Sequence, residues 1–142
     1  MPAELKYDQY LTGISSIASD CCIQFEFAGG YKTELTTGSY SLQNQVLADP
    51  KVQIKRIVVE YHEVSGILIN IKLFDKFGKE VLRSLYNQPG SKSKEYRLQD
   101  GERIIGFTSR KSSDSYTSIH KSFQFIIGGM YPEWPYICLK HL

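Results

Sequence analysis

The sequence has no apolar run that approaches the roughly 20 residues that a helix needs to cross a bilayer. Its densest apolar segment, Gly66 to Phe74, is interrupted by Asn70 and Lys72. The amino terminus also lacks the basic start and the following apolar stretch of a secretory signal. We therefore expect no membrane insertion, and the sequence favours a cytoplasmic location while leaving secretion open.

Cysteine is scarce, with only Cys21, Cys22 and Cys138 in the chain. An odd number of cysteines, two of them adjacent, is a poor framework for disulfides. We therefore favour free thiols in a reducing compartment. The alternative is a bond from Cys138 to Cys21 or Cys22, and the sequence leaves the redox state open.

An excess of charge of one sign is also missing. Lys and Arg number 17 against 15 Asp and Glu, so the net charge is 17 − 15 = +2. Nucleic-acid binders usually carry a concentrated basic face, whereas the basic residues here are interleaved with acids. The one biased stretch, Ser91 to Lys94, is predicted to be a solvated loop. We expect no nucleic-acid partner.

Arrangements of residues typical of catalysis are absent from the sequence. His62, His120 and His141 do not stand at metal-ligand spacing from one another or from the cysteines. No Gly-x-Ser-x-Gly elbow prepares a nucleophile, and the glycine pairs at 29–30 and 128–129 lack the ending of a phosphate-binding loop. The sequence predicts no metal, no cofactor and no enzyme activity.

What the sequence does contain is a series of predicted strands separated by turns. A chain of 142 residues is long enough for one domain with a substantial core. Apolar residues recur at the two-residue period of half-buried strands, and 75–78 reads as a turn before a returning strand. This period marks Ile23, Phe25 and Phe27, then Ile67, Ile69, Ile71 and Leu73, then Phe123, Phe125 and Ile127. The pattern predicts an all-β protein.

The only helical candidate is the beginning of the chain. Leu5, Tyr10, Ile14 and Ile17 are spaced at three to five residues, although Gly13 and several serines weaken a helix. We predict a short helix or an irregular arm over residues 1–20. Residues 21–142 are predicted to form a single all-β domain.

An internal repeat suggests how the strands are organised. Residues 23–29 and 123–129 share one pattern (apolar, Gln, Phe, any, apolar, small, Gly) at an offset of 100 positions. Residues 69–73 supply a third alternating strand near the midpoint. Three units of roughly 47 residues would account for the whole length. We therefore predict a threefold arrangement of sheets, with a β-sandwich as the alternative.

Two segments resemble jacalin-like lectin domains. They are Ile54 to Ile69, with Val64-Ser65-Gly66 at its turn, and Tyr96 to Phe107, with Asp100-Gly101-Glu102 before an isoleucine pair. The resemblance covers Gln53 to Gly129 and is one of pattern rather than identity. It implies a β-prism of three Greek-key sheets and carbohydrate binding. In that family the sugar is held by a glycine near the amino terminus and by a Gly-x-x-x-Asp loop near the carboxyl end.

The sequence departs from the family at that loop. No Asp follows four residues after Gly128 or Gly129, and Glu133 is a loose substitute. The same segment gathers aromatic residues between two prolines, and such side chains suit recognition surfaces. The alternative is that Trp134 fills the end of the core. The predicted ligand-binding residues are Gly29, Gly30, Tyr131, Glu133, Trp134 and Tyr136.

Two classes of function remain. The first is a non-catalytic, jacalin-like module that recognises carbohydrate or a protein partner through its loops. The alternative is a structural or adaptor subunit of a larger protein assembly, such as a cytoskeletal or ciliary one, with no sugar binding. The family pattern favours the first, the missing Asp favours the second, and a homo-oligomer is left open.

Overall fold

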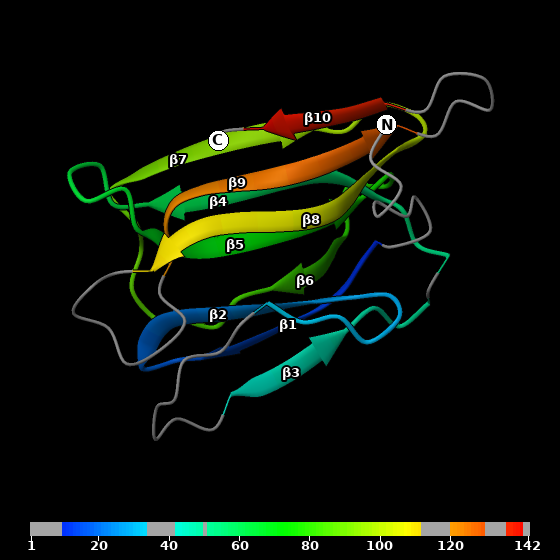
Figure 1. Ribbon diagram of the computed structural model, residues 1–142. Coiled ribbons are helices and arrows are strands. Elements are labelled where there is room, and N and C mark those ends of the chain that lie inside the picture. Colours follow the sequence, from blue (N-terminus) through cyan, green and yellow to red (C-terminus); the bar gives the residue numbers. More distant parts are fainter. Residues whose placement is uncertain (1–9, 34–41, 50, 112–119, 130–135, 141–142) are drawn as a thin grey trace.

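The computed structural model of the chain describes residues 10–33, 42–49, 51–111, 120–129 and 136–140, and these residues form no helix (Figure 1). The strands are β1 (Leu11–Ile17), β2 (Asp20–Phe27), β3 (Gln43–Val46), β4 (Ile54–Tyr61), β5 (Leu68–Asp75), β6 (Glu80–Arg83), β7 (Lys92–Arg97), β8 (Glu102–Lys111), β9 (His120–Gly129) and β10 (Tyr136–Lys140). The all-β fold class predicted from the two-residue period is confirmed.

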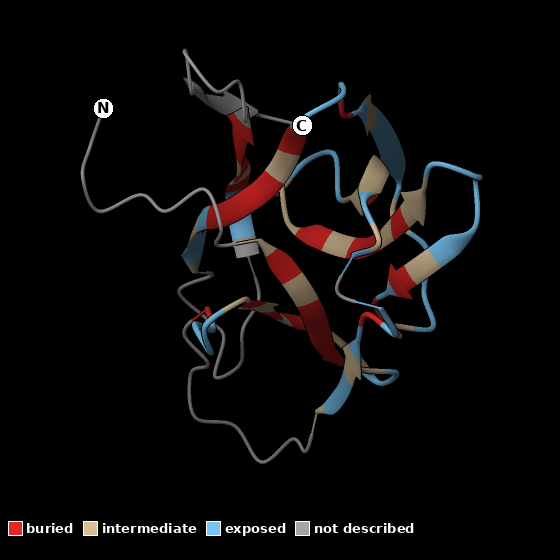
Figure 2. Cartoon of the chain, turned by 90° about the vertical axis from the view of Figure 1, so that its right-hand side faces the viewer, coloured by how far each residue is buried: buried red, intermediate tan, exposed pale blue. Residues whose placement is uncertain are grey.

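The strands form three antiparallel sheets, and each sheet comes from one consecutive part of the chain. The strand orders are β2-β1-β3, β6-β5-β4-β7 and β10-β9-β8. Strands of each sheet contact strands of both other sheets, so the three sheets surround one core, which Figure 2 shows from one end of the molecule. The three predicted units thus correspond to three sheets rather than to the two sheets of a sandwich.

The middle sheet has Greek-key connections. Strands β4, β5 and β6 follow one another as neighbours, and β7 returns to lie beside β4. The first sheet is similar, because β3 returns to lie beside β1. The position beside β2, which β6 fills beside β5 in the middle sheet, holds no full strand. It holds a single bridge between Glu26 and Lys32, after the turn that follows β2. Within the described residues, the third sheet is a simple meander.

The repeated segments meet in the core. The ring of Phe25 in β2 lies 5.8 Å from the ring of Phe125 in β9 and 4.5 Å from that of Phe107 in β8, measured between centroids. Each fully buried side chain of this size stabilises the fold by about 1.5–3 kcal/mol relative to exposure. The largest fully buried side chains are Phe25, Phe27, Phe125, Leu11, Ile14, Ile23, Ile57, Leu68, Ile71, Leu73, Ile127 and Val59.

The prediction of a helix or an arm over residues 1–20 is wrong from residue 11 onward, because 11–17 form the central strand of the first sheet. The small residues that weaken a helix suit this strand. An added Cβ at Gly13 would lie 2.8 Å from the backbone oxygen of Gln45 in β3. Ser15 donates its hydroxyl to Asn44 at 3.1 Å. The close approach of a neighbouring strand overrides the loose helical spacing.

The predicted loop at Ser91 to Lys94 is also mostly strand. Lys92 to Lys94 belong to β7, which pairs with β4 at the edge of the middle sheet. The side chains of Lys92, Ser93 and Lys94 are exposed, which makes the segment look like a loop in sequence. Lysines on an edge strand discourage pairing with a second molecule.

Candidate functional site

One end of the molecule collects many of its loops. In the middle sheet, β4 begins where β5 ends, since Ile54 pairs with Asp75. Strand β7 ends at the same place, since Arg97 pairs with Arg56. The turn from β5 to β6 and the connection from β7 to β8 therefore lie side by side.

The other two sheets bring loops to the same end. The guanidinium of Arg103, near the start of β8, lies 4.9 Å from the ring centre of Tyr10. The carbonyl of Tyr10 accepts a hydrogen bond from the amide of Ala28, just after β2, at 2.8 Å. The start of β8 pairs with Gly129, which in turn pairs with Tyr136 at the start of β10. We call this end, which faces the viewer in Figure 2, the loop end.

The structure brings three predicted site residues to the loop end. Gly29 and Gly30 form the turn after β2, with φ angles of 90° and 85° that favour glycine. Tyr136 is the first residue of β10, and its backbone pairs with Gly129. The predictions for Tyr131, Glu133 and Trp134 fall outside the described residues.

Exposed hydrophobic side chains gather at the loop end. Among the described residues, four large hydrophobic side chains are exposed, namely Tyr31 (53%), Val46 (57%), Phe77 (83%) and Val64 (91%). Tyr31 follows the Gly29–Gly30 turn, Val46 ends β3, and Phe77 is in the β5–β6 turn, all at the loop end. Val64 lies in the β4–β5 turn at the opposite end. Because aromatic residues are enriched at binding interfaces, we treat the exposed ring at this turn as a candidate contact site.

The β5–β6 turn presents Phe77 to solvent in a fixed geometry. The side chain of Asp75 accepts hydrogen bonds from the amides of Phe77 and Lys79, both at 2.9 Å. Gly78 takes a φ of 80°, which favours glycine. The ammonium of Lys76 lies 5.1 Å from the ring centre of Phe77, within the range of a cation–π contact.

Two hollows flank this turn. The first, which we call the Phe77 hollow, has a volume of about 330 Å³ and is lined by Asp49, Lys51, Val52, Gln53, Asp75, Lys76 and Phe77. The second, which we call the basic hollow, has a volume of about 590 Å³ and is lined by Lys55, Arg56, Asp75, Lys76, Gly78, Arg97, Leu98, Gln99 and Asp100. Because both include Asp75 and Lys76, one ligand could contact both.

Ion pairs link several of the charged side chains that line the basic hollow. The ammonium of Lys55 lies 2.7 Å from Asp100, and this hydrogen bond and its charge lower the pKa of the Asp100 carboxyl. Arg97 and Arg56 both approach Glu95, at 3.2 and 3.8 Å. Each of these three cationic side chains thus has a carboxylate partner beside the hollow.

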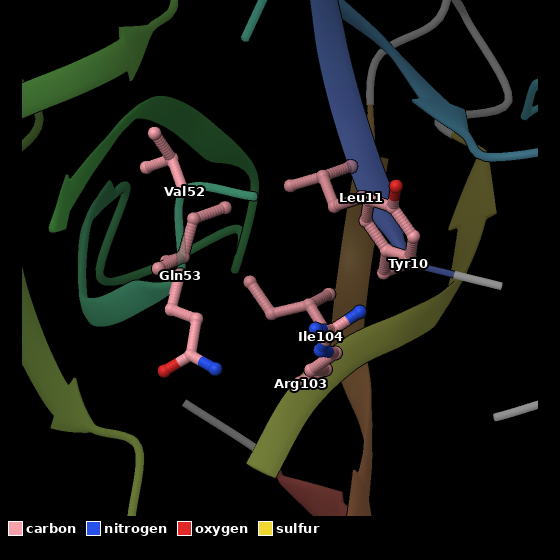
Figure 3. A pocket seen from close by; sticks show the side chains of 7 residues that line it. Tyr10, Leu11, Val52, Gln53, Arg103 and Ile104 are labelled. Carbon is pink, nitrogen blue, oxygen red and sulfur yellow. The ribbon is translucent and has the colours of Figure 1, made fainter. Parts of the chain in front are cut away.

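A third cavity, shown in Figure 3, is too small for a ligand. It lies where the three sheets meet at the loop end, between the start of β1, the start of β8 and the segment before β4. Its volume is about 20 Å³, which is room for about one water molecule. The lining residues are Tyr10, Leu11, Val52, Gln53, Ile54, Arg103 and Ile104.

A contact between His62 and Ser65 lies away from the hollows. In the turn at the opposite end, Nδ1 of His62 lies 3.1 Å from the hydroxyl of Ser65 and accepts a hydrogen bond from its amide at 3.3 Å. This contact shapes an exposed turn. Among the residues that the structure describes, no three His, Cys, Asp or Glu side chains gather as metal ligands would, and no helix is long and apolar enough for a membrane span.

Sequence reasoning missed Phe77 and the basic hollow. The turn at 75–78 was predicted, but its aromatic residue was not singled out. The available signal was an aromatic side chain inside a four-residue turn, where polar residues are usual. The basic hollow had no such signal, because its cations come from three separate segments.

Comparison with known proteins identifies no family for this chain. No protein-family model matches it, and no curated protein matches it significantly.

Proposed function

We propose that this protein is a non-catalytic binding module that recognises carbohydrate through its loop end. The observation that carries the proposal is Phe77, an aromatic ring that is 83% exposed at a hydrogen-bonded turn and borders an open hollow. An exposed aromatic ring is unfavourable in water, and it contributes no packing to the core. Recognition of a partner accounts for its place.

The chemistry around Phe77 suits a sugar. The apolar face of a pyranose can stack on an aromatic ring, and its hydroxyl groups need hydrogen-bond partners nearby. The Phe77 hollow supplies the carboxylates of Asp49 and Asp75 and the amide of Gln53. Ligand sites typically combine an apolar surface with a few such polar groups.

The resemblance to jacalin-like lectins agrees with this proposal at the level of architecture. We propose that the three sheets form a β-prism, supported by the Greek-key order of β4–β7. The proposed contact through Phe77 differs from the family's Gly-x-x-x-Asp loop, which this sequence lacks. Gly29 and Gly30 at the same end stay part of the proposed binding surface.

A glycan array tests the proposal. We expect the wild-type protein to bind a defined set of glycans, and Phe77→Ala to weaken that binding about tenfold, the loss of one aromatic anchor. Val64→Ala removes an equally exposed side chain at the opposite end and should leave binding unchanged. Trp134→Ala tests the predicted aromatic loop in parallel. Absence of binding to any glycan would refute the proposal.

A second candidate is docking of a protein partner at the loop end, as an adaptor subunit. It is favoured by Tyr31 and Val46, which are exposed hydrophobic side chains at the same end as Phe77. Crosslinking in native extract would then capture one specific protein with wild type and with Val64→Ala, but not with Phe77→Ala. If this result is obtained and no glycan on the array is bound, docking of a protein partner becomes the supported function and carbohydrate recognition is refuted.

A further inference from the structure

We infer that the basic hollow binds the acidic group of a sugar, a sulfate or a carboxylate, so that the carbohydrate recognised at the loop end is an acidic one. This inference rests on the proposed carbohydrate binding and names its ligand class. It is carried by the charges that line the hollow and by the position of the hollow beside Phe77.

The first observation is the balance of charge. The lining contains four cationic residues, Lys55, Arg56, Lys76 and Arg97, and two carboxylates, so its formal charge is 4 − 2 = +2. The whole chain has the same net charge, 17 − 15 = +2. Even when Glu95, which pairs with both arginines, is counted with the lining, a surplus of one cation remains.

The second observation is that the two lining carboxylates already have partners. Asp100 is held by the ammonium of Lys55 at 2.7 Å. Asp75 accepts two amide hydrogen bonds that shape the β5–β6 turn. Asp100 is therefore already paired with a cation, and the charge of Asp75 is already included in the surplus of two cations.

The cationic side chains at the mouth keep donors for a ligand. The side chain of Arg97 is 75% exposed, and only its Nε approaches Glu95 closely, at 3.2 Å. A guanidinium has further N–H groups in a planar fork that matches a sulfate or a carboxylate. Within the part of the chain that the structure describes, Lys76 forms no ion pair.

The third observation is position. Lys76 and Asp75 line both hollows, and the ammonium of Lys76 lies over the ring of Phe77 at 5.1 Å. A sugar ring stacked on the face of Phe77 that Lys76 leaves open would therefore lie beside Lys76, at the border of the basic hollow. A volume of about 590 Å³ is within the usual range of small-ligand sites.

Matched pairs of oligosaccharides test this inference by calorimetric titration. Maltohexaose is compared with sulfated maltohexaose, and methyl-esterified oligogalacturonate with the free acid, so that each pair differs in its acidic groups. We expect the acidic member of at least one pair to bind about tenfold tighter, as two added ion pairs of modest strength would give. Its binding should weaken as salt is raised, because salt screens such pairs.

Charge-removing variants locate the site. Lys76→Gln with Arg97→Gln should weaken the acidic ligand about tenfold. Lys92→Gln with Lys94→Gln removes the same charge from edge strand β7 outside the hollow and should change binding less than about twofold. Should the first double variant fail to fold, the salt dependence of wild-type binding still tests the inference. An affinity for the acidic ligand that does not change with salt concentration would contradict it.

Each outcome has a separate meaning. Equal binding of acidic and neutral members with loss in Phe77→Ala would overturn the inference and leave the proposed function standing. No binding of any oligosaccharide would overturn both. Equal binding of polyglutamate or duplex DNA would also overturn the inference, because the hollow would then attract any polyanion. Inorganic sulfate alone should bind more weakly than the sulfated sugar.

Discussion

Asn70 and Ser84 form a buried polar contact that joins β5 to the segment after β6. The hydroxyl of Ser84 donates to the side-chain oxygen of Asn70 at 2.6 Å, and the amide group of Asn70 donates to the carbonyls of Tyr86 and Gln88 at 3.1 and 3.0 Å. Asn70 is 7% exposed and Ser84 3%. Buried polar groups left without partners are costly, so this contact fixes the path of the chain towards β7.

We predict that Asn70→Ala lowers the free energy of unfolding by about 2–3 kcal/mol, because several buried groups lose their partners. Asn87→Ala is the matched control, since Asn87 is exposed and should cost less than about 0.5 kcal/mol. Urea denaturation measures both. Equal stability of the two variants would contradict the role assigned to Asn70.

Cys21 illustrates how burial suppresses the reactivity of a thiol. Burial first, and then the neighbouring Asp20, raise the pKa of Cys21 from 9.0 to about 11. Because the folded state holds this proton more tightly, the contribution of the thiol to stability is complete below pH 9. It is lost as the pH rises from 9 towards 11.

We predict slow alkylation of Cys21 in the folded protein at pH 8, because a thiol with a pKa of about 11 holds about 100-fold less thiolate there than one with a pKa of 9.0. Burial also raises the pKa of the Cys22 thiol, so both should react slowly. The rate is measured in a Cys138→Ser background, with and without urea. Similar rates in both conditions would disprove the prediction.

At the scale of the element, the close approach of β1 and β3 depends on a glycine. An added Cβ at Gly13 would meet the backbone oxygen of Gln45 at 2.8 Å, whereas one at Gly106 would meet the end of the flexible Ile126 side chain at 3.0 Å. Backbone atoms cannot move aside as a side chain can. The two glycines thus form a matched pair.

We predict that Gly13→Ala destabilises the protein by about 1–3 kcal/mol through overpacking, and that Gly106→Ala costs clearly less. Thermal unfolding of both variants measures the difference. A larger loss of stability for Gly106→Ala would contradict the prediction, because it would show that the backbone of β3 can shift away from an added Cβ at Gly13.

The sequence predicted the strands that have a regular alternation of apolar residues. It did not predict the strands whose structure depends on contacts with neighbouring strands. Phe25 and Phe125 lie in strands that the period predicted, because alternation reports directly on one buried face. Strand β1 was missed because its glycine and serines allow β3 to pack closely against it, and the sequence alone does not show that contact. The first half of strand β7, Lys92 to Lys94, was missed because an exposed, lysine-rich edge has the composition of a loop.

At the scale of the whole molecule, the repeat in the sequence predicted three units, and the structure has three sheets from three consecutive segments. The candidate site could be predicted only in part. Gly29, Gly30 and Tyr136 do lie at one end, but Phe77 and the cations of the basic hollow are assembled from distant segments. Alternation encodes what is buried and says little about which exposed side chains come together.

The most direct test of carbohydrate recognition at the loop end is an amide NMR titration of the folded protein with the best-binding oligosaccharide of the array. The account predicts saturable shifts of the amides of Phe77, Gly78, Gln99 and Asp100, with Val64 and Gly66 at the opposite end unchanged. Saturable shifts centred on the turn around Val64, with the amides of the β5–β6 turn unmoved, would contradict it.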